Sequence, residues 1–227
     1  MAKKKVLRFI HVGKCGGSTI QKLLKVSPLV ADLYDSVVQS HVCGITVDTD
    51  CDYLICLRNP ISRAISAYEW RRKLVLLDPP PNQSTRFRGE FDVLNAYDSF
   101  SSLASKLYQN DNSLNEYVAR DFQLIHHLRE SISFYLKPLL PILNSSNVYG
   151  IVCQENLSAD CINLLGIAPY GVIERKNNLR RESPGNIGDV ALYNLKRYLQ
   201  HDYQCILHLW TLGVLNDMQL ETLIFNT

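Results

Sequence analysis

Short apolar runs alternate along this chain with stretches of helical periodicity. Residues 6–12, 53–57 and 147–153 are rich in valine, isoleucine, leucine and aromatic side chains, and each run has the length of a buried strand. Between and after these runs, apolar residues recur three and four positions apart, which predicts helices. We expect helices at residues 18–26, from 60 through 72 and as far as 77, and at 114–140, 158–165 and 187–215.

Local signals mark several of the element ends. Asn59 is a good N-cap and Pro60 suits the first helical position, so a helix should begin there. Gly166 should end the helix that precedes it. Residues 78–113 are polar and rich in proline, asparagine and serine, which predicts an excursion from the sheet with little regular structure before Phe100.

Strands that alternate with helices favour an α/β protein. We expect a three-layer α/β/α arrangement with a central, mostly parallel sheet, of the P-loop-containing nucleotide-binding type. The chain shows no internal repeat and no linker, so it should form a single domain over residues 1–227. The excursion at 78–113 should lie on the side where an acceptor substrate binds. Within the expected helix 114–140, the candidate buried positions are Tyr117, Leu124, Leu128 and Ile132.

Composition narrows the class of protein. Of 227 residues, 46% are hydrophobic and 20% are charged, which is ordinary for a globular protein, and the net charge of +2 is too small for general nucleic-acid binding. The basic start is followed by an apolar run that Arg8 and His11 interrupt, unlike a signal peptide. No run reaches the roughly 18 apolar residues of a membrane span. We expect a cytoplasmic protein without a nucleic-acid partner.

Cysteine usage points away from a disulfide or metal framework. The chain has seven cysteines, an odd number, and they form no C-x-x-C pair and no metal-ligand spacing with histidine. We expect them to be mostly reduced and buried, and we expect no metal.

The run 6–12 ends in a glycine-rich turn, Gly13-Lys14-Cys15-Gly16-Gly17, before the first expected helix. Such a turn exposes backbone N–H groups beside the positive end of a helix dipole, where an anion fits. A nucleoside-triphosphate loop has its lysine after the last glycine, with Ser or Thr next for magnesium. Here the lysine precedes the glycine pair, and no apolar strand ends in an aspartate suited to hold magnesium. The alternative is a purely structural tight turn.

A second basic motif follows the run 53–57. Arg58 should stand at the end of a strand, where ligands of open α/β sheets gather. Arg63 and Ser66 lie three apart on the following helix and share a face. A guanidinium group with a hydroxyl suits a phosphate monoester, although a solvated basic helix is the alternative. Two anion sites at neighbouring strand ends would suit an adenosine that carries phosphate-like groups at both ends.

These two motifs resemble those of sulfotransferases that use 3′-phosphoadenosine-5′-phosphosulfate (PAPS). Residues 9–19, Phe-Ile-His-Val-Gly-Lys-Cys-Gly-Gly-Ser-Thr, are similar to the 5′-phosphosulfate loop of the carbohydrate-type branch, H-I-P-K-T-G-G-T-S. Residues 58–68 are similar to that family's 3′-phosphate motif, R-x-P-x-x-R-x-x-S-x-Y. The resemblance spans most of the chain, but only these two motifs are specific.

The resemblance implies a role for each matching residue. Lys14 would stabilise the leaving phosphate oxygen, and Arg58 and Ser66 would hold the 3′-phosphate, with Arg63 either assisting or only packing. His41 matches the histidine of the family's H-x-x-Y-G segment, which acts as general base. The remaining implied cofactor contacts are Cys15, Gly16, Gly17, Ser18 and Thr19 in the loop and, by a loose match, Lys176 and Asn177 in the basic segment 171–186.

Three positions depart from the family pattern. Gly13 replaces a proline, Cys15 replaces a threonine and so removes a hydroxyl donor, and Cys43 replaces the tyrosine near His41. Glu155 is therefore kept as an alternative base. His11 should be a packed, hydrogen-bonded side chain, and the other four histidines, 126, 127, 201 and 208, should be surface or core groups.

The expected activity is sulfuryl transfer from PAPS, as co-substrate, to a hydroxyl or amine of a carbohydrate or small metabolite. Some aromatic residues of the excursion and of the helix after it could contact that acceptor, or could instead be buried in the core. These are Tyr97, Phe100, Tyr108 and Tyr117. Two alternatives stay open: a P-loop kinase of a small metabolite, and a nucleotide-binding protein that kept the scaffold without turnover.

Overall fold

A computed structural model describes residues 5–42, 45–170 and 186–225. Tertiary contacts divide the chain into two compact units that interleave in sequence. The first unit comprises Met1–Asn59, Ile132–Lys176 and Gln204–Asn226, and the second comprises Pro60–Ser131 and Asn177–Tyr203. The single domain expected from the sequence stays a prediction.

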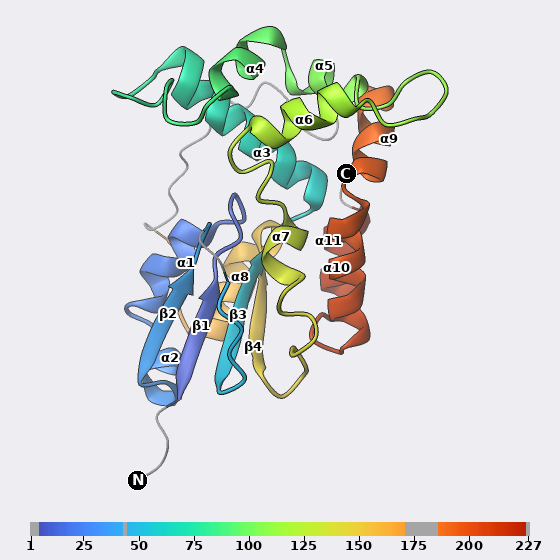
Figure 1. The fold of residues 1–227 in the computed structure, drawn as a ribbon. Helices are drawn as coiled ribbons and strands as arrows, with labels where there is room; N and C mark the ends of the chain where they lie inside the picture. The colour runs from blue at the N-terminus through green and yellow to red at the C-terminus, as the bar shows by residue number, and fades with distance from the viewer. Residues whose placement is uncertain (1–4, 43–44, 171–185, 226–227) are drawn as a thin grey trace. The chain divides into compact units, whose positions relative to one another are not determined.

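The first unit contains a four-stranded, all-parallel sheet (Figure 1). Its strands are β1 (Val6–Ile10), β2 (Ser36–Ser40), β3 (Cys51–Leu57) and β4 (Val148–Cys153), in the order β2-β1-β3-β4. The three predicted strands are confirmed, and every residue of β3 is buried. Strand β2 was not predicted. Because all strands are parallel, their carboxyl ends lie along the same edge of the sheet.

Helices flank this sheet (Figure 1). Helix α8 packs against β4 and also against the two helices that follow β1. Gly166 ends α8 in the left-handed conformation, with φ of 69°, as its sequence predicted. The helices of this unit are α1 (Gly17–Leu24), α2 (Pro28–Leu33), α7 (Ile132–Leu136), the 3₁₀ turn η2 (Gln154–Asn156), α8 (Leu157–Leu165), α11 (Asp217–Phe225) and the later part of α10 (Gln200–Thr211).

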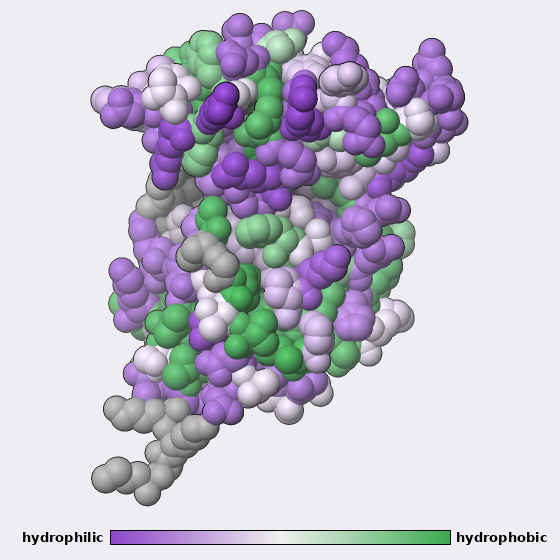
Figure 2. Space-filling model, in the orientation of Figure 1, coloured by the Kyte–Doolittle hydropathy of each residue, from purple (hydrophilic) through white to green (hydrophobic). Residues whose placement is uncertain are grey.

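Hydrophobic side chains also reach the surface of the first unit, as the face in Figure 2 shows. Val37 and Val38 on the edge strand β2 are 38% and 41% exposed. Six described cysteines are buried, in agreement with the expectation of packed thiols. None of the described helices is long and apolar enough to cross a membrane.

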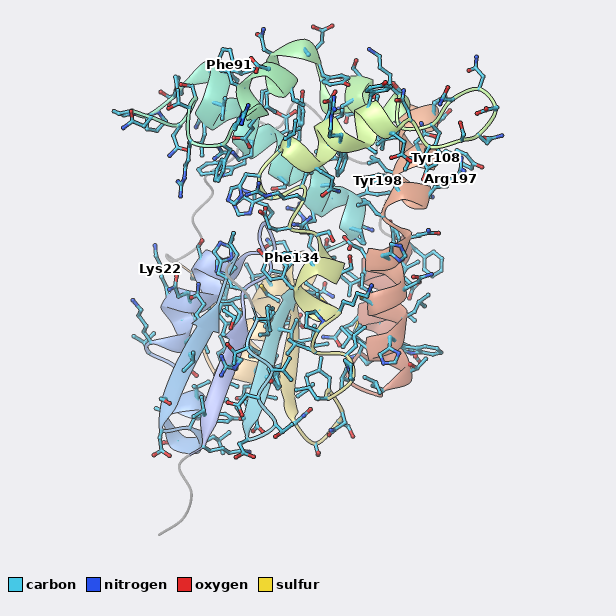
Figure 3. All side chains as sticks on the ribbon, in the orientation of Figure 1. Lys22, Phe91, Tyr108, Phe134, Arg197 and Tyr198 are labelled. Atoms are coloured by element: carbon cyan, nitrogen blue, oxygen red, sulfur yellow. The ribbon has the colours of Figure 1, made fainter. Side chains whose placement is uncertain are left out.

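The second unit is helical. Its elements are α3 (Pro60–Arg72), the π-helix η1 (Lys73–Leu77), α4 (Glu90–Ala96), α5 (Phe100–Ser105), α6 (Glu116–Leu124) and α9 (Asp189–Tyr198). The predicted start of α3 at Pro60 is confirmed. Tyr68, Phe100 and Phe122 are fully buried in the core of this unit. The guanidinium of Arg197 lies 3.8 Å from the centre of the Tyr108 ring, and both are labelled in Figure 3.

Three helix predictions were wrong. The single helix expected over 114–140 is broken: α6 ends at Leu124 and α7 begins at Ile132, and His127 between them has a left-handed backbone with φ of 69°. Tyr117 on α6 is 75% exposed, whereas the predicted burial of Leu128 is confirmed. The helix expected over 187–215 is divided between α9 and α10, and α4 forms in a segment expected to be irregular.

Candidate functional site

Each strand of the parallel sheet is followed by a polar side chain at the carboxyl edge. His11 follows β1, His41 follows β2, Arg58 follows β3 and Gln154 follows β4. The pairing of Ile10 with both Ser40 and Ile55 brings His11 level with His41, and Arg58 follows two residues beyond that level on the neighbouring strand. Ligands of open α/β sheets bind at this edge, so it is the candidate site of the first unit.

The glycine-rich turn that follows β1 lies at this edge. Lys14 and Gly16 both have left-handed backbones, with φ of 70° and 80°. Gly16 is the N-cap of α1, and no side chain caps that helix. The first N–H groups of a helix have no acceptor within it, and they stand at the positive end of its dipole. The start of α1 therefore offers donors and positive potential to an anion.

Gly16 and Gly17 of the turn lie against side chains that follow the strands. A Cβ on Gly16 would fall 2.0 Å from Oε1 of Gln154, and one on Gly17 would fall 1.9 Å from Cδ2 of His11. No larger residue fits at either position without displacing its neighbour. Close packing against the ring of His11 thus requires glycine at position 17, and the left-handed backbone favours glycine at position 16. These contacts place the turn against the ends of β1 and β4.

The remaining loop residues differ in what they can offer a ligand. The side chain of Cys15 is fully buried, and its Sγ lies 3.8 Å from the carbonyl oxygen of Gly13. A ligand could therefore contact Cys15 only through the backbone. Ser18 is exposed at the start of α1, and Thr19 is buried. Of the two hydroxyls proposed for phosphosulfate binding, that of Ser18 is the more accessible.

Arg58 lies beside the glycine-rich turn. Its Nη1 donates a hydrogen bond to the carbonyl oxygen of Lys14 at 3.4 Å. Oε1 of Glu155 lies 3.9 Å from Nε of Arg58 and accepts a hydrogen bond from the backbone N–H of Asn59 at 3.0 Å. The structure thus brings Lys14 and Arg58 together in one unit. Glu155 holds the segment after β3, which favours a positioning role for it over that of a base.

His41 is held in the tautomer that a general base requires. Its Nδ1 lies 2.8 Å from the backbone carbonyl oxygen of His11. A carbonyl oxygen can only accept, so Nδ1 carries the hydrogen and Nε2 of the neutral ring carries the lone pair. Val42, next in the chain, has φ of 57°. This is an unfavourable conformation for a β-branched residue, and such strain gathers at functional sites.

The ring of His11 packs against both His41 and the glycine-rich turn. Its ring stacks on that of His41, with the centroids 4.0 Å apart, and its Nδ1 accepts a hydrogen bond from Nε2 of Gln39 at 3.1 Å. Burial, followed by the charges of His41 and Lys14, lowers the pKa of His11 to about 3. His11 is therefore neutral at physiological pH. The prediction of a packed, hydrogen-bonded side chain is confirmed.

Two predicted phosphate ligands lie in the second unit. Arg63 on α3 is 1% exposed, and its Nη2 donates hydrogen bonds to the backbone carbonyl oxygens of His127, at 2.7 Å, and of Glu130. Of its two predicted roles, this geometry favours packing. Ser66, one turn further along α3, is also buried. Lys176 and Asn177 lie outside the described residues.

Sequence reasoning missed two neighbours of the site. Gln39, which orients His11, lies on the unpredicted strand β2, and Gln154, which packs on Gly16, follows β4 directly. A search of the first residue after every predicted strand would have found Gln154.

Comparison with protein families and with curated proteins found no match for this chain. The candidate site therefore rests on its own residues and geometry.

Proposed function

We propose that this protein is a sulfotransferase that moves a sulfuryl group from PAPS to a hydroxyl or amine of a carbohydrate or small metabolite. One observation carries the proposal. The glycine turn with Lys14, Arg58 and His41, whose Nε2 carries the lone pair in the neutral tautomer, all lie at the same edge of a parallel sheet. The sequence resemblance to PAPS-dependent enzymes supplies the donor, and with it the P-loop type of fold.

The glycine turn would bind the 5′-phosphosulfate. Its left-handed residues, Lys14 and Gly16, direct the turn into the start of α1, where backbone N–H groups need acceptors. Arg58 is adjacent and would bind the 3′-phosphate, to which the resemblance adds Ser66. The donor set consists of amides, a lysine and an arginine, which suits an anion handled without a metal.

The transfer itself is an in-line displacement. Nε2 of His41 would remove the proton from the acceptor hydroxyl, whose oxygen forms a bond to sulfur. The bond between sulfur and the bridging oxygen of the 5′-phosphate breaks at the same time, and that oxygen leaves with the electron pair. Lys14 and the amides of the turn would stabilise the negative charge on it. The protein's contribution is thus position and electrostatics.

Nucleotide binding provides the first test. We expect 3′,5′-adenosine bisphosphate to raise the melting temperature of the full chain without magnesium, and ATP to do so weakly. Lys14→Ala and Arg58→Ala should lose most of this shift. Lys22→Ala is the matched control, because Lys22 is an exposed lysine at the far end of α1 (Figure 3). Loss of the shift in the control as well would contradict the assignment.

Turnover provides the second test. Candidate acceptors would be incubated with labelled PAPS and screened by mass spectrometry for a sulfated product. His41→Ala should keep the nucleotide-induced shift and lose transfer, since His41 is assigned to the acceptor proton and not to the nucleotide. Full transfer by Lys14→Ala would refute the role of that lysine. Stabilisation that requires magnesium and ATP would instead favour a kinase, and tight binding without any transfer would favour a nucleotide-binding protein.

A further inference from the structure

The break between α6 and α7 gathers three side chains that metals prefer. His126, His127 and Glu130 lie in the segment 125–131, where the sequence predicted an uninterrupted helix. Neighbouring residues of a regular helix point about 100° apart. Here the left-handed backbone of His127 breaks the helix, and the two imidazole rings lie with centroids 4.1 Å apart and planes tilted by 32°. A disfavoured conformation at a non-glycine residue is a reason to look for a function.

The three side chains are close enough to share one cation. One ligand atom from each lies within 4.8 Å of the others, and Nδ1 of His126 is 3.2 Å from Oε2 of Glu130. Metal–ligand bonds of about 2.0–2.1 Å in a tetrahedral site place ligand atoms about 3.3 Å apart. The widest separation must therefore close by at most about 1.5 Å, which rotation of a half-buried imidazole can supply.

The surroundings hold these side chains in place. Oε2 of Glu130 accepts the backbone N–H of His127 at 2.6 Å, and an oxygen with two lone pairs can accept this bond and still bind a cation. Oε1 of Glu90 accepts the backbone N–H of His126 at 2.8 Å, and the ring of Phe87 stacks on His126 at 4.3 Å. Such outer contacts fix the direction of metal ligands.

We propose that His126, His127 and Glu130 bind one transition-metal cation of the zinc class. Two imidazoles and a carboxylate are ligands that Zn²⁺ favours, and three protein ligands leave a position for water. In the part of the chain that the structure describes, this is the one group of three such side chains that could hold a metal. The site lies in the second unit and goes beyond the proposed transfer reaction.

The positive charge of Arg129 lies beside the proposed site and should weaken cation binding there, which gives the proposal a specific test. Its Nε pairs with Oε1 of Glu130, and its side chain is 41% exposed. A guanidinium there competes with a metal for the carboxylate and repels it, but it is exposed enough to move into solvent. Removal of this charge should therefore tighten metal binding. A surface histidine that bound metal adventitiously would not respond to Arg129.

The experiment measures metal on the full chain, freed of any affinity tag and of bound metal. Zn²⁺ is titrated by calorimetry, and Co²⁺ is followed by its visible absorption, which reports tetrahedral coordination. We expect one Zn²⁺ per chain. Loss of an outer contact alone often weakens metal binding about tenfold, so His126→Ala and Glu130→Gln should weaken it at least that much. His208→Ala, an exposed histidine on α10, is the matched control and should bind as the parent does.

Several outcomes would overturn the site. These are the absence of saturable Zn²⁺ binding, equal losses in His126→Ala and His208→Ala, and unchanged or weaker binding in Arg129→Gln. The Arg129 variant removes no proposed ligand, so it keeps the test decisive if a ligand variant fails to fold. Because metal is read directly, the result does not depend on any transferase activity.

Discussion

Replacement of Gly17 by alanine tests whether the glycine turn is fixed by the ring of His11. Gly17 is the first residue of α1. An alanine Cβ would lie 1.9 Å from Cδ2 and 2.1 Å from Nε2 of His11, far inside van der Waals contact. That ring cannot easily move, because it stacks on His41 and accepts a hydrogen bond from Gln39.

Two opposing free energies set the expected size of the effect. Alanine restricts the unfolded chain more than glycine does, which stabilises the folded protein by about 0.4–1 kcal/mol. Overpacking of a closely packed position costs about 1–3 kcal/mol, and the held ring favours the upper part of that range. We therefore expect Gly17→Ala to lower the free energy of unfolding by about 1–2 kcal/mol. The melting temperature should fall by about 2–8 °C for a chain of this size.

Urea denaturation of four proteins measures this effect: the parent, Gly17→Ala, His11→Ala and the double variant. Removal of the ring removes the clash, so the two losses should not add, and the coupling should be about 1 kcal/mol or more. Gly213→Ala is the control: nothing lies within 4 Å of its Cβ, so it should show no coupling to His11. A Gly17→Ala protein as stable as the parent, or additive losses, would refute the packing of the turn on His11.

Three further predictions concern stability. The buried guanidinium of Arg71 pairs with Glu90 at 2.6 Å, so Glu90→Ala leaves it without this partner and should lower the free energy of unfolding, measured in urea, by about 3–5 kcal/mol. The double variant Arg71→Met, Glu90→Leu removes both charges and should lose far less stability. A loss below about 1 kcal/mol in Glu90→Ala would contradict this. Arg63→Met should lose about 2–3 kcal/mol of stability without change in nucleotide affinity; the opposite pattern would make Arg63 a phosphate ligand. The pKa of His11 falls from 6.5 to about 3 on folding, so its contribution is complete above pH 6.5 and is lost as pH falls toward 3, by about 2 kcal/mol at pH 5. His11→Gln should therefore depend less on pH between 7.5 and 5, and an equal dependence would exclude this linkage.

Much of the fold could be predicted where the signal is local. The start of α3 follows from Asn59 and Pro60, the end of α8 from Gly166, and the buried strands from their apolar runs. The glycine turn was identifiable for the same reason, because a strand, a turn and a helix follow one another within about twenty residues. Lys14 and Arg58 could thus be chosen as candidates from the order of residues along the chain, whereas His41 was chosen through the resemblance to a family motif.

Other features depend on contacts between distant residues. Strand β2 has only five residues, most of them exposed, and it forms because it pairs with β1. The break at 125–131 is stabilised by Arg63, which donates to two of its carbonyl oxygens from α3. The stacking of His11 on His41 depends on the register between β1 and β2. Periodicity along the sequence carries none of this information.

The interleaving of the two units has a consequence for synthesis on the ribosome. Strands β1, β2 and β3 are complete once residue 57 has been made, but β4, which covers the other edge of β3, begins only at Val148. At about 5–20 residues per second, the nascent chain waits about 5–18 seconds for that strand. Throughout this delay the backbone N–H and C=O groups along that edge of β3 have no partner strand, so we expect the growing polypeptide to need chaperone protection until translation passes Cys153.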